Sequence, residues 1–266
     1  MTRHGESFQL ISSLKIQGRV IFALLMREII TRFGRHNIGF LWLLGEPMLF
    51  TVGVTTLWTL SKATHGSHLD IISFAITGYS SVLLWRNCAN RCALAIAPNL
   101  TLLFHRNVKI IDILLSRILL EIAGATTSFV ALLLVCIFFG LIDYPSDILM
   151  MMFGWVLLSM FSAGLGMVVG MISERGEMFE RFWHIVTYLT FPMSGAVFMV
   201  DWLPARAREV VLYFPMVHGV EIIRSGYYGD KVVSHYSFAY LAIFSLVLIL
   251  IGLILVEDTK KKVGSF

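Results

Sequence analysis

The sequence predicts an all-α, polytopic membrane protein, because its composition is strongly apolar and its apolar segments are long. Of 266 residues, 57% are hydrophobic and only 14% are charged, whereas soluble domains carry roughly 45–50% apolar and about 25% charged residues. The apolar runs show no alternation with a period of two, so helices that satisfy their own backbone hydrogen bonds are expected rather than a barrel. We expect residues 1–266 to form a single transmembrane domain.

Six segments have the composition of transmembrane helices, which need about 20 apolar residues each. They occupy residues 40–60, 71–90, 118–139, 148–172, 184–200 and 238–256. The fifth is the shortest and contains Pro192. Residues 40–200 are therefore predicted to hold spans one to five and residues 236–256 span six, which leaves residues 257–266 as a tail.

The distribution of Lys and Arg predicts that both termini lie in the cytoplasm. The N-terminal segment, the second and fourth connections and the C-terminal tail together hold 16 of these residues, and the remaining connections hold 5. Cytoplasmic segments of membrane proteins carry the excess of Lys and Arg. This orientation also explains the sequence pI of about 9.0, so no nucleic-acid partner is expected.

Residues 1–39 contain an amphipathic pattern that predicts a cytoplasmic helix lying in the membrane interface. Apolar residues recur at helical spacing on one face, and polar residues occupy the opposite arc. The apolar face comprises Phe22, Met26, Ile29, Ile30 and Phe33. Such a helix either anchors the chain at the membrane surface or also meets a cytoplasmic partner through its polar face.

Two connections on the predicted cytoplasmic side are polar enough to meet water. Residues 99–117 mix apolar residues with Arg106, Lys109 and Asp112, which predicts either a short helix parallel to the membrane or a solvated loop. Residues 173–181 place three glutamates beside two arginines. We expect a solvated helical turn there, because exposed ion pairs contribute little individually.

Small and acidic residues inside the predicted spans have structural interpretations. Ser162, Gly166 and Gly170 follow a small-xxx-small spacing that lets helices approach closely, within the chain or between subunits. Glu46 and Glu121 would be costly if they were unpaired in the membrane. We expect pairing rather than proton relay, with arginines at similar depth, namely Arg86, Arg91 and Arg117.

Residues 201–235 precede the last span and are too polar to form a seventh one. A window over residues 205–224 contains five charged side chains, and each costs about 2.5–3.5 kcal/mol at a helix centre. A seventh span would also move the C-terminal lysines to the outer side. We expect a periplasmic, re-entrant segment instead.

This re-entrant segment is predicted to contain a pair of short helices, over residues 204–213 and 215–226. A proline begins each of them, and proline suits the first turn of a helix. The second helix carries the candidate gate residues Pro215, Glu221 and Arg224. Glu221 and Arg224, three residues apart, either pair with each other or contact the transported molecule.

Aromatic side chains are abundant in and beside the predicted spans. Many are expected in the belts at the membrane interfaces. Those that face the interior of a bundle would offer apolar faces on which sugar rings stack without a tight hydrogen-bond code. The candidates for such a substrate path are Trp42, Trp58, Tyr79, Trp85, Tyr188 and Phe191.

The sequence carries no signature of catalysis or of nucleotide binding. It has no GxxxxGK(S/T) phosphate loop, no HExxH motif and no GxSxG motif. We therefore assign no catalytic residue, no metal ligand and no cofactor to this chain. Energy for transport against a gradient would come from another chain or an ion, and the scarcity of intramembrane carboxylates argues against the ion.

The stretch LLMREIITRFGRHNIGFLWLLGEP, residues 24–47, resembles the N-terminal signature of inner-membrane permeases of bacterial capsular polysaccharide ABC exporters, the KpsM-like branch of the type-2 ABC exporter family. The resemblance continues through HRNVKIIDILLSRILLE and MISERGEMFERFWHIVTY, and it covers nearly the whole chain. One departure is Gly45, where this branch usually has a bulkier residue before the glutamate. That departure changes local packing and leaves the implied roles intact.

The resemblance implies a homodimer of six-span subunits in the bacterial inner membrane, with two cytoplasmic ATP-binding subunits that bind ATP and Mg. The substrate implied is an anionic, lipid-linked polysaccharide, which moves among membrane lipids toward a periplasmic co-polymerase-type adaptor and an outer-membrane export protein. It also implies that the connection between spans two and three couples to the ATPase. The residues so assigned are Arg106, Asn107, Val108 and Lys109, with Arg32 and Arg35 beside them.

Two other functions remain as alternatives. The same architecture serves permeases for drugs or small lipids, which transport of a labelled glycan would distinguish. A membrane enzyme such as a glycan-lipid transferase would need activity without an ATPase partner, and no carboxylate constellation in the sequence supports it. The expectation is a transport subunit that is not itself an enzyme.

Overall fold

The protein is described here by a computed structural model that covers residues 3–33, 38–60, 69–93, 95–103 and 108–263. Within these ranges the regular structure is helical and contains no strand. The α-helices are α1 (Arg3–Phe33), α2 (Ile38–Leu60), α3 (Ile71–Cys92), α4 (Leu100–Leu103), α5 (Ile110–Phe138), α6 (Ile148–Ser173), α7 (Glu177–Thr190), α8 (Ala205–Val211), α9 (Pro215–Tyr228) and α10 (Phe238–Val263). Short 3-10 turns lie at Ala97–Asn99, Val200–Trp202 and Gly229–Lys231. The predicted all-α class is confirmed.

Among the described residues, three helices are long and apolar enough to cross a membrane: Ile110–Phe138, Ile148–Ser173 and Phe238–Lys261. A shorter apolar helix covers Met48–Leu60. The chain is therefore a multi-pass membrane protein, whereas the full count of six spans stays a prediction.

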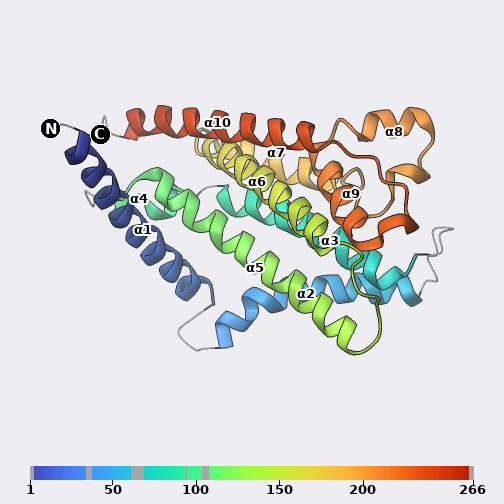
Figure 1. Cartoon of the computed structure of the whole chain (residues 1–266). Coiled ribbons are helices and arrows are strands. Elements are labelled where there is room, and N and C mark those ends of the chain that lie inside the picture. Colours follow the sequence, from blue (N-terminus) through green and yellow to red (C-terminus); the bar gives the residue numbers. More distant parts are fainter. Residues whose placement is uncertain (1–2, 34–37, 61–68, 94, 104–107, 264–266) are drawn as a thin grey trace.

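Both chain termini lie at one end of the molecule, on the left of Figure 1, together with α4. We call this the terminal end. The opposite end, which we call the far end, holds α8, α9 and the connection between α5 and α6. The connection that contains α4, predicted to be cytoplasmic, and the segment that contains α8 and α9, predicted to be periplasmic, thus lie at opposite ends of the bundle.

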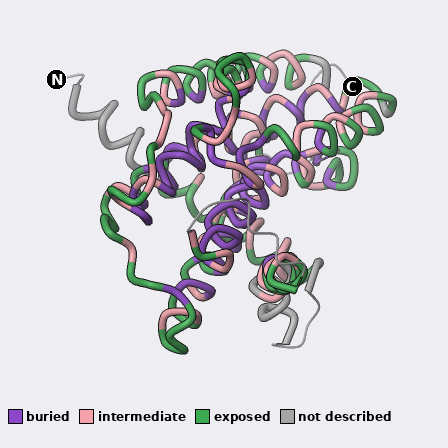
Figure 2. The backbone as a smooth tube through the Cα atoms, turned by 90° about the vertical axis from the view of Figure 1, so that its right-hand side faces the viewer, coloured by how far each residue is buried: buried purple, intermediate pink, exposed green. Residues whose placement is uncertain are grey.

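The helix α6 lies at the centre of the packing and contacts α3, α9 and α10. A Cβ atom added at Gly166 would lie 3.2 Å from the carbonyl oxygen of Cys88, and one at Gly170 would lie 2.9 Å from that of Cys92. Both glycines therefore let α6 approach α3 closely, which confirms helix packing within the chain as the role of this spacing. Buried residues gather along this central region in Figure 2.

The helix α5 begins at Ile110, eight residues before the predicted third span. Its start is fixed by Asp112, whose carboxylate accepts a hydrogen bond from the backbone N–H of Lys109 at 3.0 Å. Such a contact satisfies a backbone donor at the first turn. The expectation of a surface helix or loop over 99–117 is therefore wrong from residue 110 onward, and before that point the structure describes a short helical segment over Ala97–Leu103.

The helix α7 ends at Thr190, so the continuous fifth span predicted over residues 184–200 is wrong from Phe191 onward. Pro192 lies two residues after Thr190 and has no backbone N–H with which to continue the helical hydrogen bonds. Gly195 then adopts a positive φ of 81°, a conformation that glycine adopts without a steric penalty. Residues 191–199 form an irregular turn, which we call the 191–199 turn.

The two short helices predicted before the last span are confirmed as α8 and α9, and Pro215 occupies the first turn of α9.

Charged side chains near the terminal end are paired across elements. Glu121 lies 3.9 Å from Arg91, as expected, whereas Arg117 pairs with Glu28 of α1 at 3.3 Å. The guanidinium of Arg86 instead lies 4.8 Å from the ring centroid of Tyr188. The side chain of Glu46 lies outside the described part of the chain.

Candidate functional site

The far end contains a fully buried arginine, Arg224 of α9. Its guanidinium donates hydrogen bonds to the carbonyl oxygens of Gly195 at 2.6 Å, of Ala196 at 2.7 Å and of Phe198 at 2.7 Å. These carbonyls belong to the 191–199 turn, where no helix satisfies them, and buried carbonyls need a donor. A planar guanidinium presents five donors in a fixed fork and can serve several acceptors together. Arg224 therefore fastens the turn to α9.

The same guanidinium also packs on α3. Its central carbon lies 3.6 Å from the ring centroid of Phe74, a cation–π contact. Gly78 provides the space for this arrangement, because a Cβ atom at that position would lie 2.5 Å from the Ala196 oxygen and 2.6 Å from the Arg224 Nη2 atom. Three segments, α3, the 191–199 turn and α9, thus meet around one cation.

Two further polar side chains of α9 hold neighbouring loops. The Glu221 carboxylate accepts hydrogen bonds from the backbone N–H groups of Val200 at 3.1 Å and His235 at 2.9 Å. His218 accepts at Nδ1 from the backbone N–H of Ser237 at 3.0 Å, so in its neutral form Nε2 donates to the Leu212 carbonyl at 2.9 Å. We call Arg224, Glu221 and His218 with these backbone partners the α9 clamp.

The clamp answers the question of how Glu221 and Arg224 are used in the folded chain. The two groups attract each other electrostatically, but their shortest hydrogen bonds go to backbone groups of separate segments rather than to each other. Both side chains are buried, at 1% and 0% exposure. In this geometry the two side chains hold separate backbone segments, and a contact with a transported molecule stays a prediction. Pro215 begins the helix that presents both side chains.

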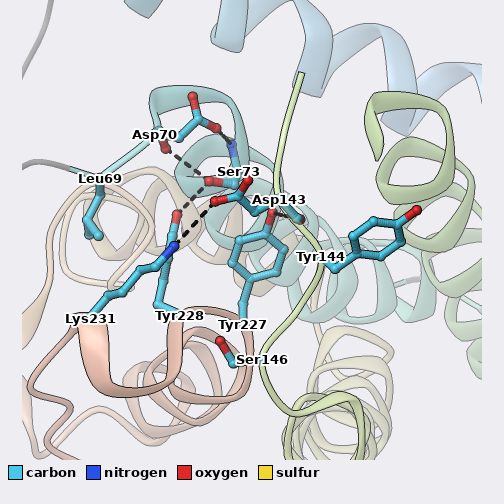
Figure 3. Close-up of a pocket in the computed structure, with 9 residues that line it drawn as sticks. All are labelled: Leu69, Asp70, Ser73, Asp143, Tyr144, Ser146, Tyr227, Tyr228 and Lys231. Carbon is cyan, nitrogen blue, oxygen red and sulfur yellow. Dashed lines mark hydrogen bonds and ion pairs between the residues drawn. The ribbon is translucent and has the colours of Figure 1, made fainter. Parts of the chain in front are cut away.

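Beside the clamp, a polar pocket of about 130 Å³ joins α3, the connection between α5 and α6, and the end of α9 (Figure 3). Its polar groups bind one another: Ser73 and Tyr228 share a hydrogen bond of 2.9 Å, and Lys231 lies 3.3 Å from Asp143. The Tyr227 hydroxyl donates to the Asp143 carbonyl at 2.8 Å. The hydrogen bonds and the ion pair that line this pocket therefore fix the C-terminal end of α9 to its neighbours.

At the terminal end, the short helical segment Ala97–Leu103 is held by side chains from two other helices. Glu174, the residue after α6, accepts hydrogen bonds from the backbone N–H groups of Ile96 at 2.6 Å and Ala97 at 3.4 Å. Arg27 of α1 donates to the side-chain oxygen of Asn99 at 2.7 Å. The expectation of a merely solvated turn at residues 173–181 is wrong for Glu174, because its carboxylate binds the start of this segment.

The start of α5 is tied to α1 in the same region. Asp112 is buried and accepts a hydrogen bond from the side chain of Gln17 at 2.9 Å, in addition to its contact with the Lys109 backbone. Together with the contact between Arg27 and Asn99, this ties α1 to the described residues that precede and follow 104–107 in the sequence. The predicted interfacial helix therefore contacts the connection directly.

The sequence matches the family described as ABC-2 type transporter over residues 19–228, which is most of the chain. The chain belongs to this family. A permease of this family works with an ATP-binding partner in an exporter system.

This ABC-2 transporter is similar over nearly its full length to three named relatives. It is 42% identical over 261 residues to the capsule polysaccharide export inner-membrane protein BexB of Haemophilus influenzae, covering 98% of each chain. It is 45% identical over 260 residues to the corresponding protein CtrC of Neisseria meningitidis serogroup B, covering 98% of this chain and 97% of the relative. It is 29% identical over 255 residues to the polysialic acid transport protein KpsM of Escherichia coli, covering 94% of this chain and 97% of the relative.

The structure of the transporter places part of the predicted coupling set. Lys109 is exposed directly before α5 and Val108 is half-buried. Arg106, Asn107 and Arg35 lie outside the described residues, as does the side chain of Arg32. Val108 and Lys109 directly precede α5, and Val108 packs against the same hydrophobic cluster as Leu103 of the short helical segment.

Three of the predicted path aromatics come together in the transporter. Tyr79 of α3 lies 5.5 Å from Trp58 of α2 and 5.6 Å from Phe191, measured between ring centroids. The others are separate: Trp85 is buried in the hydrophobic core, Tyr188 is exposed, and the side chain of Trp42 lies outside the described residues. We call Trp58, Tyr79 and Phe191 the aromatic cluster.

Sequence reasoning missed several residues that organise both ends of the transporter. Phe74 and Gly78 complete the clamp, and Glu174 and Asn99 hold the short helical segment. Each acts through a partner far away in the chain, so no local pattern marks it. The one signal visible in the sequence is Gly78, because an isolated glycine within a helix often marks a close approach of another segment.

Proposed function

We propose that this chain is the transmembrane permease subunit of an ATP-driven exporter that moves lipid-linked capsular polysaccharide from the cytoplasm across the bacterial inner membrane. The observation that carries the proposal is the near full-length similarity, at 42% and 45% identity, to two capsule polysaccharide export inner-membrane proteins. Membership of the ABC-2 type transporter family agrees with it. The chain acts as a transport subunit, and ATP with Mg binds a separate partner chain.

In this proposal the terminal end faces the cytoplasm and the far end faces the periplasm. The excess of Lys and Arg on the segments of the terminal end supports this orientation. The chain then crosses the membrane six times, α1 lies in the cytoplasmic interface, and α8 and α9 form the re-entrant segment. The burial of charged groups within the α9 clamp supports re-entry, because a buried and hydrogen-bonded charge tolerates a low-dielectric site.

Coupling is proposed to occur at the connection between α3 and α5. Two ATP-binding subunits would bind beneath a homodimer of permeases and contact Arg106, Asn107, Val108 and Lys109, with Arg32 and Arg35 nearby. The anchoring of this connection to α1 and α6 supports the proposal, since a docking element must be tied to the helices that it moves. The exposed side chain of Lys109 is available to an acidic partner surface.

Transport itself needs no covalent chemistry in this chain. Closure of the ATP-binding subunits would rock the permeases and open a path at the dimer interface. The aromatic cluster offers apolar ring faces to a sliding glycan, and the α9 clamp would keep the re-entrant helices shaped as a gate. The emerging anionic polymer would then pass to a periplasmic co-polymerase-type adaptor and an outer-membrane export protein.

The test is transport by the purified complex in phospholipid vesicles. Radiolabelled, lipid-linked capsular polysaccharide should cross the bilayer only with ATP and only when this chain is present. Deletion of its gene should trap polymer inside the cell. Transport of a drug or a small lipid in place of the glycan would favour the alternative permease, and export that continues without this chain would overturn the proposal.

The most direct partner test is co-purification. A protein with a Walker-type phosphate loop should be recovered with the affinity-tagged permease from native membranes. Activity of the purified permease alone on a glycan-lipid, without that partner, would favour the enzyme alternative instead.

A further inference from the structure

The end of α6 is bound directly to the start of the short helical segment Ala97–Leu103. Glu174 follows the last residue of α6, and its Oε1 atom accepts the backbone N–H groups of both Ile96 and Ala97. At 2.6 Å the bond to Ile96 has the short length of a charge-assisted hydrogen bond. Ile96 is itself buried, so this joint between α6 and the short helical segment is an internal part of the fold.

The two N–H groups bound by Glu174 are those that a helix start leaves unsatisfied. Ile96 and Ala97 stand at the beginning of the segment Ala97–Leu103, where N–H groups have no partner within the helix. A carboxylate at this position both satisfies the donors and complements the positive end of the helical segment. Glu174 therefore fixes where the segment begins.

The other end of α6 is packed just as tightly against α9. A Cβ atom at Gly219 of α9 would lie 2.8 Å from Leu158, and one at Gly154 of α6 would lie 2.6 Å from Ile222. Gly226 of α9 lies against the backbone N atom of Met151 in the same way. Close approach at three points leaves little freedom for α9 to move independently of α6.

The helix between these two joints is continuous. α6 runs over 26 residues, about 39 Å at 1.5 Å per residue, from the α9 clamp region to Glu174. It contacts α3 and α10, and its buried residues belong to both large hydrophobic clusters. One rigid element thus joins the segment proposed to receive the ATP-binding subunit to the helix proposed to gate the exit.

We propose that Glu174 is a positioning residue that ties the short helical segment Ala97–Leu103 to α6, so that a displacement of the connection between α3 and α5 by the ATP-binding subunit is carried along α6 to α9. This inference rests on the proposed function, because it assumes that the connection between α3 and α5 receives the ATPase. Glu174 contacts neither nucleotide nor glycan in this scheme. It acts only by holding two backbone N–H groups to the end of α6.

The test uses the full-length permease in complex with its ATP-binding subunits, in bacterial phospholipid vesicles. Glu174→Ala removes the acceptor, Glu174→Asp withdraws it by one methylene, and Glu174→Gln keeps an oxygen at the same distance. Glu180→Ala is the matched control, because Glu180 belongs to the same acidic stretch and its carboxylate makes no hydrogen bond or ion pair with the described residues. Should the alanine variant fail to fold, the aspartate variant tests the same contact.

Coupling is read out by polysaccharide transport per ATP hydrolysed and by a reporter on the far end. The reporter is Val233→Cys, on an exposed loop two residues before the His235 N–H that Glu221 binds. Its labelling by an impermeant maleimide, measured against the parent without this cysteine, should change on addition of ATP. In Glu174→Ala and Glu174→Asp this change should vanish and transport per ATP should fall about tenfold or more, the effect expected for loss of charged hydrogen bonds. Glu180→Ala should stay within about twofold of the parent, whereas Glu174→Gln should lose less coupling than Glu174→Ala, since it keeps an acceptor oxygen at residue 174 without the charge.

Each contrary result overturns a distinct statement. If the parent complex couples and Glu174→Ala couples equally well, the inference fails while the proposed function stands. If Glu174→Ala loses the ATP-binding subunits on purification, Glu174 belongs to docking and the transmission role is wrong. If the parent itself neither binds an ATPase nor transports glycan, the proposed function fails first.

Discussion

At the scale of single residues, the far end depends on one buried cation. Arg224 has no exposed surface, and its desolvation is offset by carbonyl oxygens of the 191–199 turn and by the ring of Phe74. A buried charge is stable only when such partners surround it. The irregular turn and the buried arginine therefore stabilise each other. Without Arg224 the buried carbonyls would lack a donor, and without the carbonyls the buried charge would lack acceptors.

Replacement of Arg224 by methionine should destabilise the protein by about 3 kcal/mol, because several buried carbonyls would lose their donor. Arg224→Lys should also lose stability, since an ammonium is a point charge without the planar fork. Thermal unfolding in detergent, followed by tryptophan fluorescence, measures the effect. The control is Arg206→Ala on the exposed surface of α8, and equal stability of the two variants would contradict the clamp.

Charge exchange between Glu221 and Arg224 should fail to restore function. Because the carboxylate binds N–H groups and the guanidinium binds carbonyls, exchanged side chains would present donors to donors and acceptors to acceptors. The double variant Glu221→Arg with Arg224→Glu should fold no better than Arg224→Glu alone. Recovery of export or of yield in the double variant would show that the two side chains act mainly as a pair.

At the scale of elements, α9 is held by close approach as well as by polar contacts. Its neighbours α3 and α6 each offer glycine at a contact, Gly78 in α3 and Gly154 in α6. Interiors packed at this density do not accept an added methyl group without displacement. The position of α9 is therefore set by close contact with its neighbours, and the hydrogen bonds of the α9 clamp fix its orientation.

Gly78→Ala should destabilise the protein by about 1–3 kcal/mol, because its Cβ atom would overlap the Ala196 oxygen and the Arg224 side chain. Gly53→Ala in α2 is the matched control, since a Cβ atom there meets nothing within 4 Å and alanine favours the helix. Relative melting temperatures of the two variants check the prediction. A Gly78→Ala protein that melts with the parent would show that the clamp can shift without cost.

At the scale of the whole molecule, polar contacts at the terminal end bring α1, α5 and α6 to one connection. Arg27 binds Asn99, Gln17 binds Asp112 and Glu174 binds Ile96. Apolar packing along α6 then continues to the far end. This arrangement fits a permease in which a displacement at the terminal end alters the position of the helices at the far end.

Reversal of charge in the coupling connection should uncouple transport from ATP hydrolysis. Arg106→Glu combined with Lys109→Glu should abolish stimulation of the ATPase by the permease while membrane insertion continues, because Lys109 is exposed and its structural contact is through its backbone N–H. Stimulated hydrolysis and protease protection measure the two properties. Normal stimulation in this variant would remove the coupling role from the connection.

The sequence alone determined the features that local composition controls. Apolar length gave the all-α membrane class, and proline with helical spacing gave the two short helices α8 and α9. The end of α7 was less predictable, because Pro192 interrupts a segment that is otherwise apolar enough to continue. Hydropathy measures partition into the membrane and does not show where the backbone turns.

Only the tertiary structure decided what the charged residues bind. Arg224 meets carbonyls 26 to 29 residues earlier in the chain and Phe74, 150 residues earlier, and Glu174 meets an N–H group 78 residues earlier. From the sequence, Glu221 and Arg224 could equally be partners, because helical spacing places them together. Their partners are backbone groups that the 191–199 turn and its neighbours leave without helical hydrogen bonds, and such groups exist only once the fold has formed.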